Sequence, residues 1–316
     1  MLLITGGLGF IGSHVAAAHL ATDTAVVVTA LPADRVPQDL SEHLGKRLTV
    51  APVDIVDHAA LLALCRTGRI DSIIHLAGPP MGATPPFEEY RQNTIGLYNV
   101  LDVARRLGMR RVTIASSIAV YFGLARGPFA EDALVRMGAT HTIEAYKKAE
   151  ELMGLYLAGQ TGVDVVAMRL ASIYGPRYRS RRHLPAQLVH AGVRGAGAGL
   201  EPGLPRYHAG DCATDLCYVT DCAEGIRLLH AGTTLRHRVY NIGSGRDLSN
   251  ADYLAVARSL FPDLDYDVLP GRSSADWPSS VLDISRARED FGYASRHDPA
   301  VAMHEYAAWL KAGNPF

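Results

Sequence analysis

Cysteine is scarce in this chain, with only four residues among 316. They form no C-x-x-C pair and are spaced too irregularly for a disulfide framework or a zinc site. We therefore expect no bound metal, a protein of the reducing cytoplasm, and four small buried residues: Cys65, Cys212, Cys217 and Cys222.

The chain also lacks an excess of either charge. It has 31 basic and 32 acidic residues and a formal net charge of −1, which gives no reason to expect nucleic acid or an anionic membrane as a partner. No apolar run approaches the roughly 18 residues of a membrane span, and the apolar N-terminus lacks the basic residues of a signal peptide. These absences favour a small-molecule partner.

What the chain does have is a regular alternation of apolar stretches and helical ones. The composition, 48% hydrophobic and 20% charged, is typical of a globular protein. The predicted strands are 2–5, 25–30, 48–51, 72–76, 111–115 and 163–169, and the predicted helices are 14–20, 58–65, 87–107 and 142–158. Apolar strands separated by helices indicate a doubly wound α/β fold, with a parallel sheet covered on both faces.

Three glycines follow the first strand at three-residue spacing. Gly6 permits a tight turn, Gly9 lets a phosphate approach the backbone, and Gly12 lets the next helix pack against the strand. The N–H groups at the start of that helix would face the anion. Strand, glycines and helix in this order predict a dinucleotide-binding Rossmann domain.

The character of the sequence changes after Pro176. An arginine-rich stretch, 177–183, is followed by the glycine-rich, loop-like segment 192–205. We expect a Rossmann domain over 1–175, with a return segment near 238–260 that adds strand 239–242 to the sheet. The remaining 176–316 would form a smaller, mixed α/β substrate-binding domain.

Several polar or small residues lie where predicted strands end. Asp54 could accept a hydrogen bond from an adenine amino group; it could also cap the next helix, although Asp57 suits that role better. His75, taken alone, reads as a core histidine. Asn93 is a poor helix former inside a helix and so predicts a polar partner, and Ser117 ends the fifth strand.

Together these motifs resemble the extended short-chain dehydrogenase/reductase family, the NAD(P)-dependent epimerase/dehydratase group. The resemblance covers nearly the whole chain, and UDP-galactose 4-epimerase is a familiar member. It implies a nicotinamide cofactor, NAD or NADP. It also implies that Ser117 binds the reacting substrate oxygen and that Tyr146 is the general acid/base. The cofactor residues carried over are Gly6, Gly9, Phe10, Ile11, Gly12, Asp54, Ile55, Leu76, Ala77, Gly78, Asn93, Ala115, Tyr146 and Ile173.

The sequence departs from the family at its reaction centre, Y-x-x-x-K. Tyr146 is followed four residues later by Glu150, and Lys147 and Lys148 stand one and two residues on. A carboxylate in the lysine's place raises rather than lowers a tyrosine pKa. We predict that Glu150 shares the helix face of Tyr146 and has been reassigned within the catalytic set. The alternative is a solvated Glu150 in a protein with weak or lost redox activity.

Two further departures concern the ligands. Ala30 stands where NAD-preferring relatives have an acidic residue after the second strand, which leans the prediction slightly toward NADP. Thr214 and Ser273 stand where sugar-nucleotide members have phosphate-gripping arginines, which argues against a UDP-sugar. Ser172, Arg177 and Arg179 are the remaining candidates for binding the substrate, with a solvated basic loop as an equal alternative.

The sequence thus predicts an NAD(P)-dependent oxidoreductase or epimerase acting on a secondary alcohol or ketone of a sugar-like or hydroxy-acid substrate. A nucleotide-sugar 4-epimerase or dehydratase is the first alternative. A cofactor-binding protein with non-redox or lost catalysis is the second. The resemblance also implies a homodimer formed through helices 87–107 and 142–158.

Overall fold

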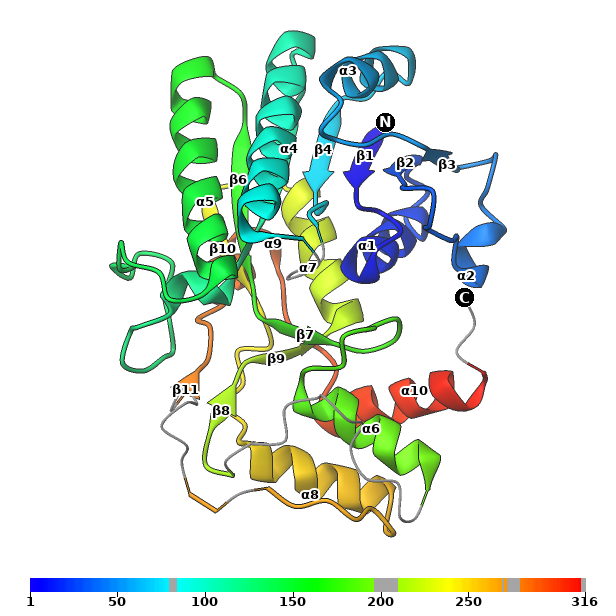
Figure 1. Cartoon of the computed structure of the whole chain (residues 1–316), viewed down its shortest axis with the longest axis vertical. Coiled ribbons are helices and arrows are strands. Elements are labelled where there is room, and N and C mark those ends of the chain that lie inside the picture. Colours follow the sequence, from blue (N-terminus) through cyan, green and yellow to red (C-terminus); the bar gives the residue numbers. More distant parts are fainter. Residues whose placement is uncertain (80–83, 196–209, 269, 272–278, 314–316) are drawn as a thin grey trace.

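The computed structural model describes residues 1–79, 84–195, 210–268, 270–271 and 279–313. Its centre is a seven-stranded parallel sheet in the order β10-β6-β5-β4-β1-β2-β3 (Figure 1). The strands are β1 (Leu2–Thr5), β2 (Val26–Thr29), β3 (Leu48–Ala51), β4 (Ser72–His75), β5 (Arg111–Ser117), β6 (Val165–Leu170) and β10 (Val239–Ile242). All six predicted strands and the returning strand are confirmed, and β1, β2, β4 and β6 are buried along their whole length, as expected for apolar strands covered on both faces.

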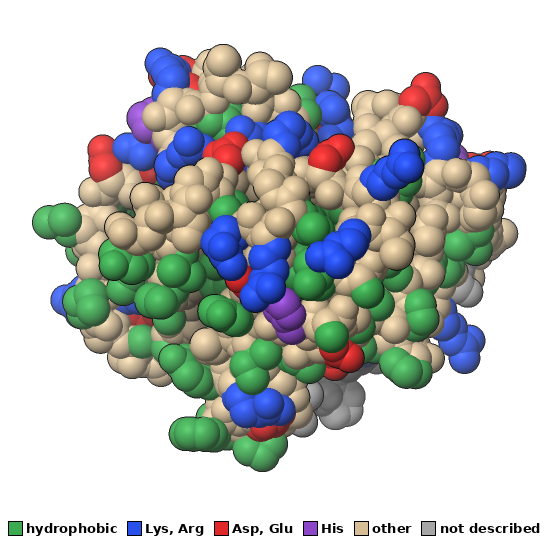
Figure 2. Space-filling model, turned by 90° about the horizontal axis from the view of Figure 1, so that it is seen from above, with side chains coloured by type: hydrophobic (Ala, Val, Ile, Leu, Met, Phe, Trp, Pro, Cys, Tyr) green, Lys and Arg blue, Asp and Glu red, His purple; other side chains and the backbone are tan. Residues whose placement is uncertain are grey.

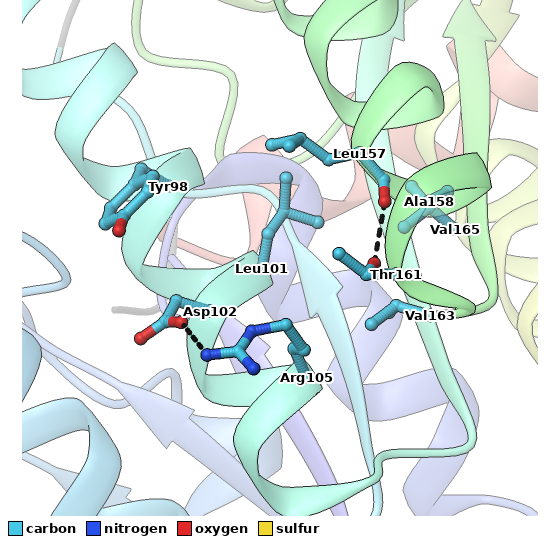
Figure 3. A pocket seen from close by; sticks show the side chains of 9 residues that line it. All are labelled: Tyr98, Leu101, Asp102, Arg105, Leu157, Ala158, Thr161, Val163 and Val165. Carbon is cyan, nitrogen blue, oxygen red and sulfur yellow. Dashed lines mark hydrogen bonds and ion pairs between the residues drawn. The ribbon is translucent and has the colours of Figure 1, made fainter.

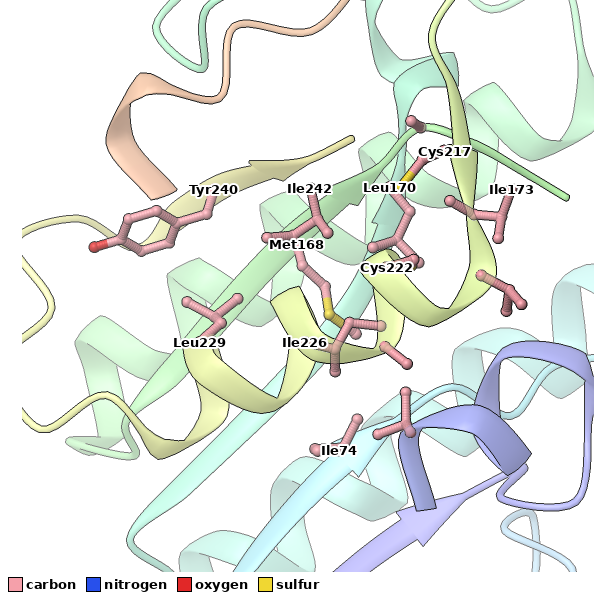
Figure 4. Close-up of a cluster of buried hydrophobic side chains, with 14 of the residues drawn as sticks. Ile74, Met168, Leu170, Ile173, Cys217, Cys222, Ile226, Leu229, Tyr240 and Ile242 are labelled. Carbon is pink, nitrogen blue, oxygen red and sulfur yellow. The ribbon is translucent and has the colours of Figure 1, made fainter. Parts of the chain in front are cut away.

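Helices cover both faces of this sheet, which confirms the doubly wound fold. One buried cluster joins the sheet to α1 (Phe10–Leu20) and α7 (Val219–Ala231). Figure 4 shows the α7 side of this cluster, with Cys222, Ile226 and Leu229 packed over the strands. A second cluster joins the opposite face to α3 (His58–Thr67), α4 (Pro86–Leu107) and α5 (Thr142–Thr161).

Local chemistry sets the ends of the covering helices. Asp57 caps α3, its carboxylate accepting from the Ala60 N–H at 3.0 Å, as expected. Pro86 occupies the first turn of α4, where its missing N–H costs nothing. Gly108 ends α4 and Gly162 ends α5, at φ of +59° and +75°, the left-handed conformation that favours glycine.

A smaller layer packs below the carboxyl edge of the sheet (Figure 1). It has its own buried cluster, formed by α6 (Leu184–Arg194), α8 (Asn250–Leu260) and α10 (Pro299–Lys311). Two parallel pairs of short strands lie beside it, β7 (Ser172–Tyr174) with β9 (Leu216–Tyr218) and β8 (Ala213–Thr214) with β11 (Ser279–Ser280). The remaining short elements are α2 (Gln38–Ser41), the 3-10 helix η1 (Ile118–Tyr121) and α9 (Ser285–Phe291).

The chain crosses between the two layers more often than the division at residue 175 predicts. Helix α7 follows that point in the sequence but packs on α1 and the sheet. Within the return segment 238–260, β10 joins the sheet while α8 packs with α6 and α10. Of the segment 192–205 expected as a loop, 192–194 close α6 and 196–205 lie outside the described residues. The domain boundary itself stays a prediction.

A buried ionic network fixes α5 against the sheet. Arg169 on β6 donates to Glu151 on α5 and to the Tyr121 hydroxyl, both at 2.8 Å, and Ser116 on β5 donates to the same carboxylate. The Arg169 and Glu151 side chains are 7% and 9% exposed, so neither charge is solvated and each depends on the other.

The four cysteines are buried and free, as expected for small core residues. Within the described ranges, no helix is both long and apolar enough to cross a membrane.

Candidate active site

The glycine turn between β1 and α1 has the geometry that its spacing predicts. Gly6 sits at φ +67°, and a side chain there would meet the Ala77 backbone at 2.9 Å. A Cβ on Gly12 would lie 2.2 Å from the Gly6 carbonyl oxygen, so only glycine lets α1 start this close to the strand. Gly9 precedes the first turn of α1, whose N–H groups point out of the helix toward the space beside the turn.

A cavity of about 380 Å³ opens beside this turn at the carboxyl edge of the sheet. It brings together seven of the predicted cofactor residues: Gly6, Gly9, Asp54, Ile55, Leu76, Ala77 and Gly78. The other residues on its wall are Thr29, Ala30, Leu31, Asp34, Val53, Val56, Pro79, Thr84 and Gln92. Backbone and small side chains therefore form most of the wall, which suits a ligand that lies flat against the strand ends.

The wall after β4 is held from below by Thr5 and His75. The Thr5 hydroxyl accepts from the N–H groups of Leu76 and Ala77 at 3.2 and 3.3 Å, and it bonds the His75 ring nitrogen at 2.7 Å. Burial, with a smaller contribution from the charge of Lys147, lowers the pKa of His75 to about 3. His75 is therefore a neutral core histidine that shapes the wall.

The wall after β3 is fixed by contacts with α4. Asn99 donates its side-chain amide to the Ile55 carbonyl at 2.8 Å. Gly96 leaves room for the Ile55 side chain, which would lie 2.6 Å from a Cβ at that position. Asp54 stays exposed at the cavity with its carboxylate accepting from the Val56 N–H at 3.1 Å.

Asp34 is a wall residue that the sequence argument missed. Its carboxylate accepts from the Leu31 N–H at 2.7 Å, which folds the segment after β2 back toward the cavity. Asp34 and Asp54 give the cavity two carboxylates, and none of the described wall residues is lysine or arginine. Ala30, at the end of β2, was the only position considered for an acidic residue in the sequence analysis. The acidic residue that lines the cavity, Asp34, comes four residues later, after the Pro32–Asp34 turn.

Helix α5 presents different sides to the sheet and to α4. Glu151 binds Ser116, and Gly154 packs against Ile114, so the side that carries residues 147, 151 and 154 faces β5. Tyr146 and Glu150 share the adjacent side, as their spacing predicts, and line a groove against α4. The structure therefore groups Tyr146 with Glu150, and the Tyr146 hydroxyl binds the start of α4 instead of Ser117.

The hydrogen bonds of these residues differ from the sequence expectation. The Tyr146 hydroxyl donates to the Pro86 carbonyl at 3.1 Å. Its pKa is raised by burial first and then by the charge of Glu89, not by Glu150. Glu150 accepts from Lys147 at 2.7 Å and has only 10% of its side chain exposed, so it is not the solvated residue of the alternative interpretation. Ser117 accepts from the Ala119 N–H at 3.1 Å where η1 begins.

The other predicted cofactor residues do not line the 380 Å³ cavity. Phe10 and Ile11 belong to the first turn of α1, where their backbone faces the glycine turn. Asn93 donates to the Glu89 carbonyl of its own helix at 2.9 Å and lines the α4–α5 groove, so its polar partner lies within α4. Ala115 packs beside the α7 cluster, and Ile173 is buried in it (Figure 4).

The arginine-rich segment forms a second cavity of about 260 Å³. Arg177 is buried at φ +69°, and its guanidinium binds Ser13 and Asp39, which ties the segment to α1 and α2. The wall consists of Arg177, Tyr178, Arg179, Arg181, His190, Tyr306 and Trp309. It shares no residue with the first cavity. Ser172 is half-buried on β7, and Ser273 lies outside the described residues.

The α4–α5 groove continues to the far ends of both helices. Figure 3 shows this part of it, where Leu101 on α4 points toward Leu157 on α5; Tyr98 and Thr161 also line it. Large apolar side chains on these helices are exposed, including Phe87 (86%), Leu152 (64%) and Tyr156 (60%).

Figure 2 looks onto the amino ends of the strands, where basic, acidic and apolar side chains are mixed.

A parallel doubly wound sheet with a glycine turn and a cavity at its carboxyl edge defines a dinucleotide-binding α/β enzyme. The model of the NAD dependent epimerase/dehydratase family matches residues 2–243. The chain therefore belongs to that family, which confirms the resemblance drawn from its motifs and the expectation of an enzyme that uses a nicotinamide cofactor.

Known proteins resemble the chain along most of its length. It is 27% identical to a UDP-glucose 4-epimerase of Azospirillum brasilense, across 94% of this chain and 88% of the relative. It is also 27% identical to a dTDP-glucose 4,6-dehydratase of Actinoplanes sp., across 98% of each. Its fold matches the solved structure of MoeE5 in complex with UDP-glucuronic acid and NAD, with a TM-score of 0.78, 25% identity and 99% of each chain covered.

Proposed function

We propose that the protein uses NAD to oxidise or reduce a secondary alcohol or ketone on a sugar, as a step of epimerisation or elimination. The observation that carries this proposal is the 380 Å³ cavity, where the glycine turn, Asp54–Ile55 and Leu76–Gly78 meet at the carboxyl edge of the sheet. When bound there, the nicotinamide supplies or accepts the hydride. The backbone of the glycine turn and α1 would hold the pyrophosphate, Asp54 the adenine, and Ser117 the substrate oxygen.

Within this proposal the cofactor is NAD rather than NADP. This choice reverses the slight preference for NADP that Ala30 suggested. A ribose 2′-phosphate would add negative charge to a cavity that already holds Asp34 and Asp54. Its described wall offers no arginine or lysine to pair with that charge. The NAD bound in the MoeE5 structure is in line with this choice.

A nucleotide sugar is the substrate class that the relatives favour. The named substrates of the epimerase and dehydratase relatives are a UDP-sugar and a dTDP-sugar. Thr214, which is uncharged, favours a second candidate, a sugar-like or hydroxy-acid substrate without a diphosphate. The Arg177 guanidinium is bound to Ser13 and Asp39, which makes Arg177 a poorer candidate for binding the substrate than its charge suggests.

We also propose a homodimer in the cytoplasm. The exposed apolar side chains on α4 and α5 would be buried if two copies paired these helices. Four free, buried cysteines suit a reducing compartment.

Calorimetry with NAD⁺ and NADP⁺ tests the cofactor, followed by incubation of the NAD-loaded protein with UDP-glucose, UDP-glucuronic acid and dTDP-glucose. We expect NAD⁺ to bind at least about tenfold more tightly than NADP⁺, a difference of about 1.4 kcal/mol. Asp34→Ser should narrow that preference, while Asp23→Ser, at an exposed aspartate outside the cavity, should leave it unchanged. Binding of neither dinucleotide would refute the proposal. Binding without turnover of any sugar would favour the cofactor-binding protein without redox activity.

A further inference from the structure

Lys147 is the cation on the sheet-facing side of α5. It precedes Glu151 by four residues, and Glu151 is bound to Ser116 on β5 and Arg169 on β6. Residues four apart lie one above the other on a helix. The Lys147 side chain therefore leaves α5 on the same side as Glu151, one turn nearer the helix N-terminus. Its side chain is 22% exposed.

The direction of α5 places Lys147 at the reacting edge of the sheet. In a parallel sheet the helix between two strands runs opposite to them, so α5 begins where β5 ends. One helical turn advances about 5.4 Å. Lys147 therefore lies about one turn beyond the level of Ser116, where the strand continues to Ser117 and the cofactor cavity opens.

An ion pair, together with a charge effect on His75, indicates where the ammonium group lies. Its nitrogen is 2.7 Å from Glu150, whose side chain is 10% exposed, so the carboxylate holds the ammonium in a partly buried position. The ammonium is also close enough to the end of β4 to help lower the pKa of His75, after the larger effect of burial. The wall residues Leu76 and Ala77 follow His75 directly.

Neither Tyr146, the preceding residue, nor Ile143, one turn earlier, offers a phenol hydroxyl on the sheet-facing side of α5. The Tyr146 hydroxyl is bonded to the Pro86 carbonyl at the start of α4. One turn before Lys147, on the same side of α5, stands Ile143, which has no titratable group. A substrate oxygen at Ser117 thus has Lys147 as the proton-carrying side chain on this side of the helix.

We propose that Lys147 gives a proton to the substrate oxygen during reduction and takes it back during oxidation, with Glu150 as its positioning residue. In the reductive direction the carbonyl carbon receives hydride, the carbonyl oxygen takes a proton from the ammonium, and Lys147 becomes a neutral amine. In the oxidative direction the hydroxyl proton returns to that amine as the C=O bond forms and hydride leaves. This inference rests on the proposed function, because NAD supplies and accepts the hydride.

Lysine footprinting tests the placement without any turnover. The protein is reductively methylated with and without saturating NAD⁺, and modification of each lysine is followed by mass spectrometry. Lys148 is the matched control, because it binds Glu144 and the carbonyls of Arg136 and Gly138 on another side of α5. We expect NAD⁺ to slow modification of Lys147 and not of Lys148. Calorimetric binding without protection of Lys147 would overturn the inference and leave the proposed function intact, whereas no binding would refute both.

Kinetics of the NAD-loaded protein with UDP-glucose and dTDP-glucose test the chemistry. Lys147→Ala should slow turnover by at least about 100-fold, with NAD⁺ affinity little changed, and ethylamine should restore part of the rate. Lys147→Arg keeps the charge but gives up its proton poorly, so it should stay slow. Glu150→Gln should slow turnover less, without amine rescue, and Lys46→Ala, at an exposed position before β3, should keep the wild-type rate. Full activity in Lys147→Arg, or loss of activity in Tyr146→Phe equal to that in Lys147→Ala, would overturn the proposal.

Discussion

The glycine turn and helix α5 both contribute to the carboxyl edge of the sheet, yet they encode their geometry differently. The turn is specified by residues that must be small, and a Cβ at Gly6 or Gly12 would collide with backbone. Helix α5 is specified by which of its sides meets the sheet, and the neighbours Glu150 and Glu151 have unrelated partners. A steric requirement can be predicted from a short sequence motif, whereas the orientation of a helix depends on the packing of the whole domain.

The largest effect on stability is expected from Glu151→Gln, which tests the sheet-facing side of α5. This change leaves the Arg169 guanidinium buried without its carboxylate, and breaking a buried pair costs about 3–5 kcal/mol. Asp267→Asn is the control, since the Arg258–Asp267 pair is exposed and such pairs contribute about 0–1 kcal/mol. Urea unfolding followed by circular dichroism measures both. Equal losses in the two variants would show that the network does not anchor α5.

The next effect is expected at the glycine turn. Gly12→Ala places a Cβ 2.2 Å from the Gly6 carbonyl oxygen, so α1 must shift, at a cost of about 1–3 kcal/mol, and NAD⁺ affinity should fall with it. Gly159→Ala in α5 meets nothing within 4 Å and should stabilise the helix by about 0.5–1 kcal/mol. Thermal unfolding and calorimetry of both variants give the comparison. Wild-type NAD⁺ affinity in Gly12→Ala would separate the turn from the cofactor.

A pH effect is expected from His75 beneath the cavity wall. Its folded pKa is about 3, below the ordinary value of 6.5, so the unfolded chain binds a proton that the folded chain does not. His75 therefore contributes stability above pH 6.5, and this contribution falls by about 1.4 kcal/mol per pH unit as the pH drops from 6.5 toward 3.

Unfolding free energies measured from pH 7.5 to 5 should therefore fall less steeply in His75→Asn than in the wild type. His14 and His19, whose burial lowers their pKa values to about 4, should keep part of the slope in the variant. His304→Asn, at an exposed position, should leave the slope unchanged. Identical slopes in all three proteins would mean that His75 does not stay neutral in the fold.

The smallest effect on the stability of one chain is expected on the side of α5 that faces away from the sheet. Leu152 is 64% exposed, so Leu152→Glu should change monomer stability by less than about 0.5 kcal/mol. It should nevertheless weaken the proposed dimer strongly, because it puts a charge into an apolar contact. Light scattering across a concentration series measures this, with Leu134→Glu, at a 91% exposed site outside both helices, as the control. A monomeric wild type would remove the basis of this prediction.

The residues of the candidate site also fall into those that a local sequence motif could predict and those that it could not. Seven of the residues predicted to bind the cofactor could be predicted to lie together because each follows a strand, and the carboxyl ends of parallel strands meet at one edge. Asp34 could not, because it reaches the cavity through an irregular turn whose direction no periodicity encodes. Arg177 was predicted for the substrate from its charge, but its left-handed backbone turns the guanidinium toward Ser13 and Asp39.

By itself the sequence determined the alternating strands and helices, the parallel sheet, the glycine turn and the family. Each of these depends on local periodicity or on a steric requirement within a few residues. Only the tertiary structure decided that Tyr146 and Glu150 face α4 while Lys147 starts from the side that meets β5. The physical reason is that successive helical residues diverge by about 100°, so a shift of one position moves a side chain from the groove to the sheet. Only the packing of Glu151 and Gly154 against β5 fixes which position that is.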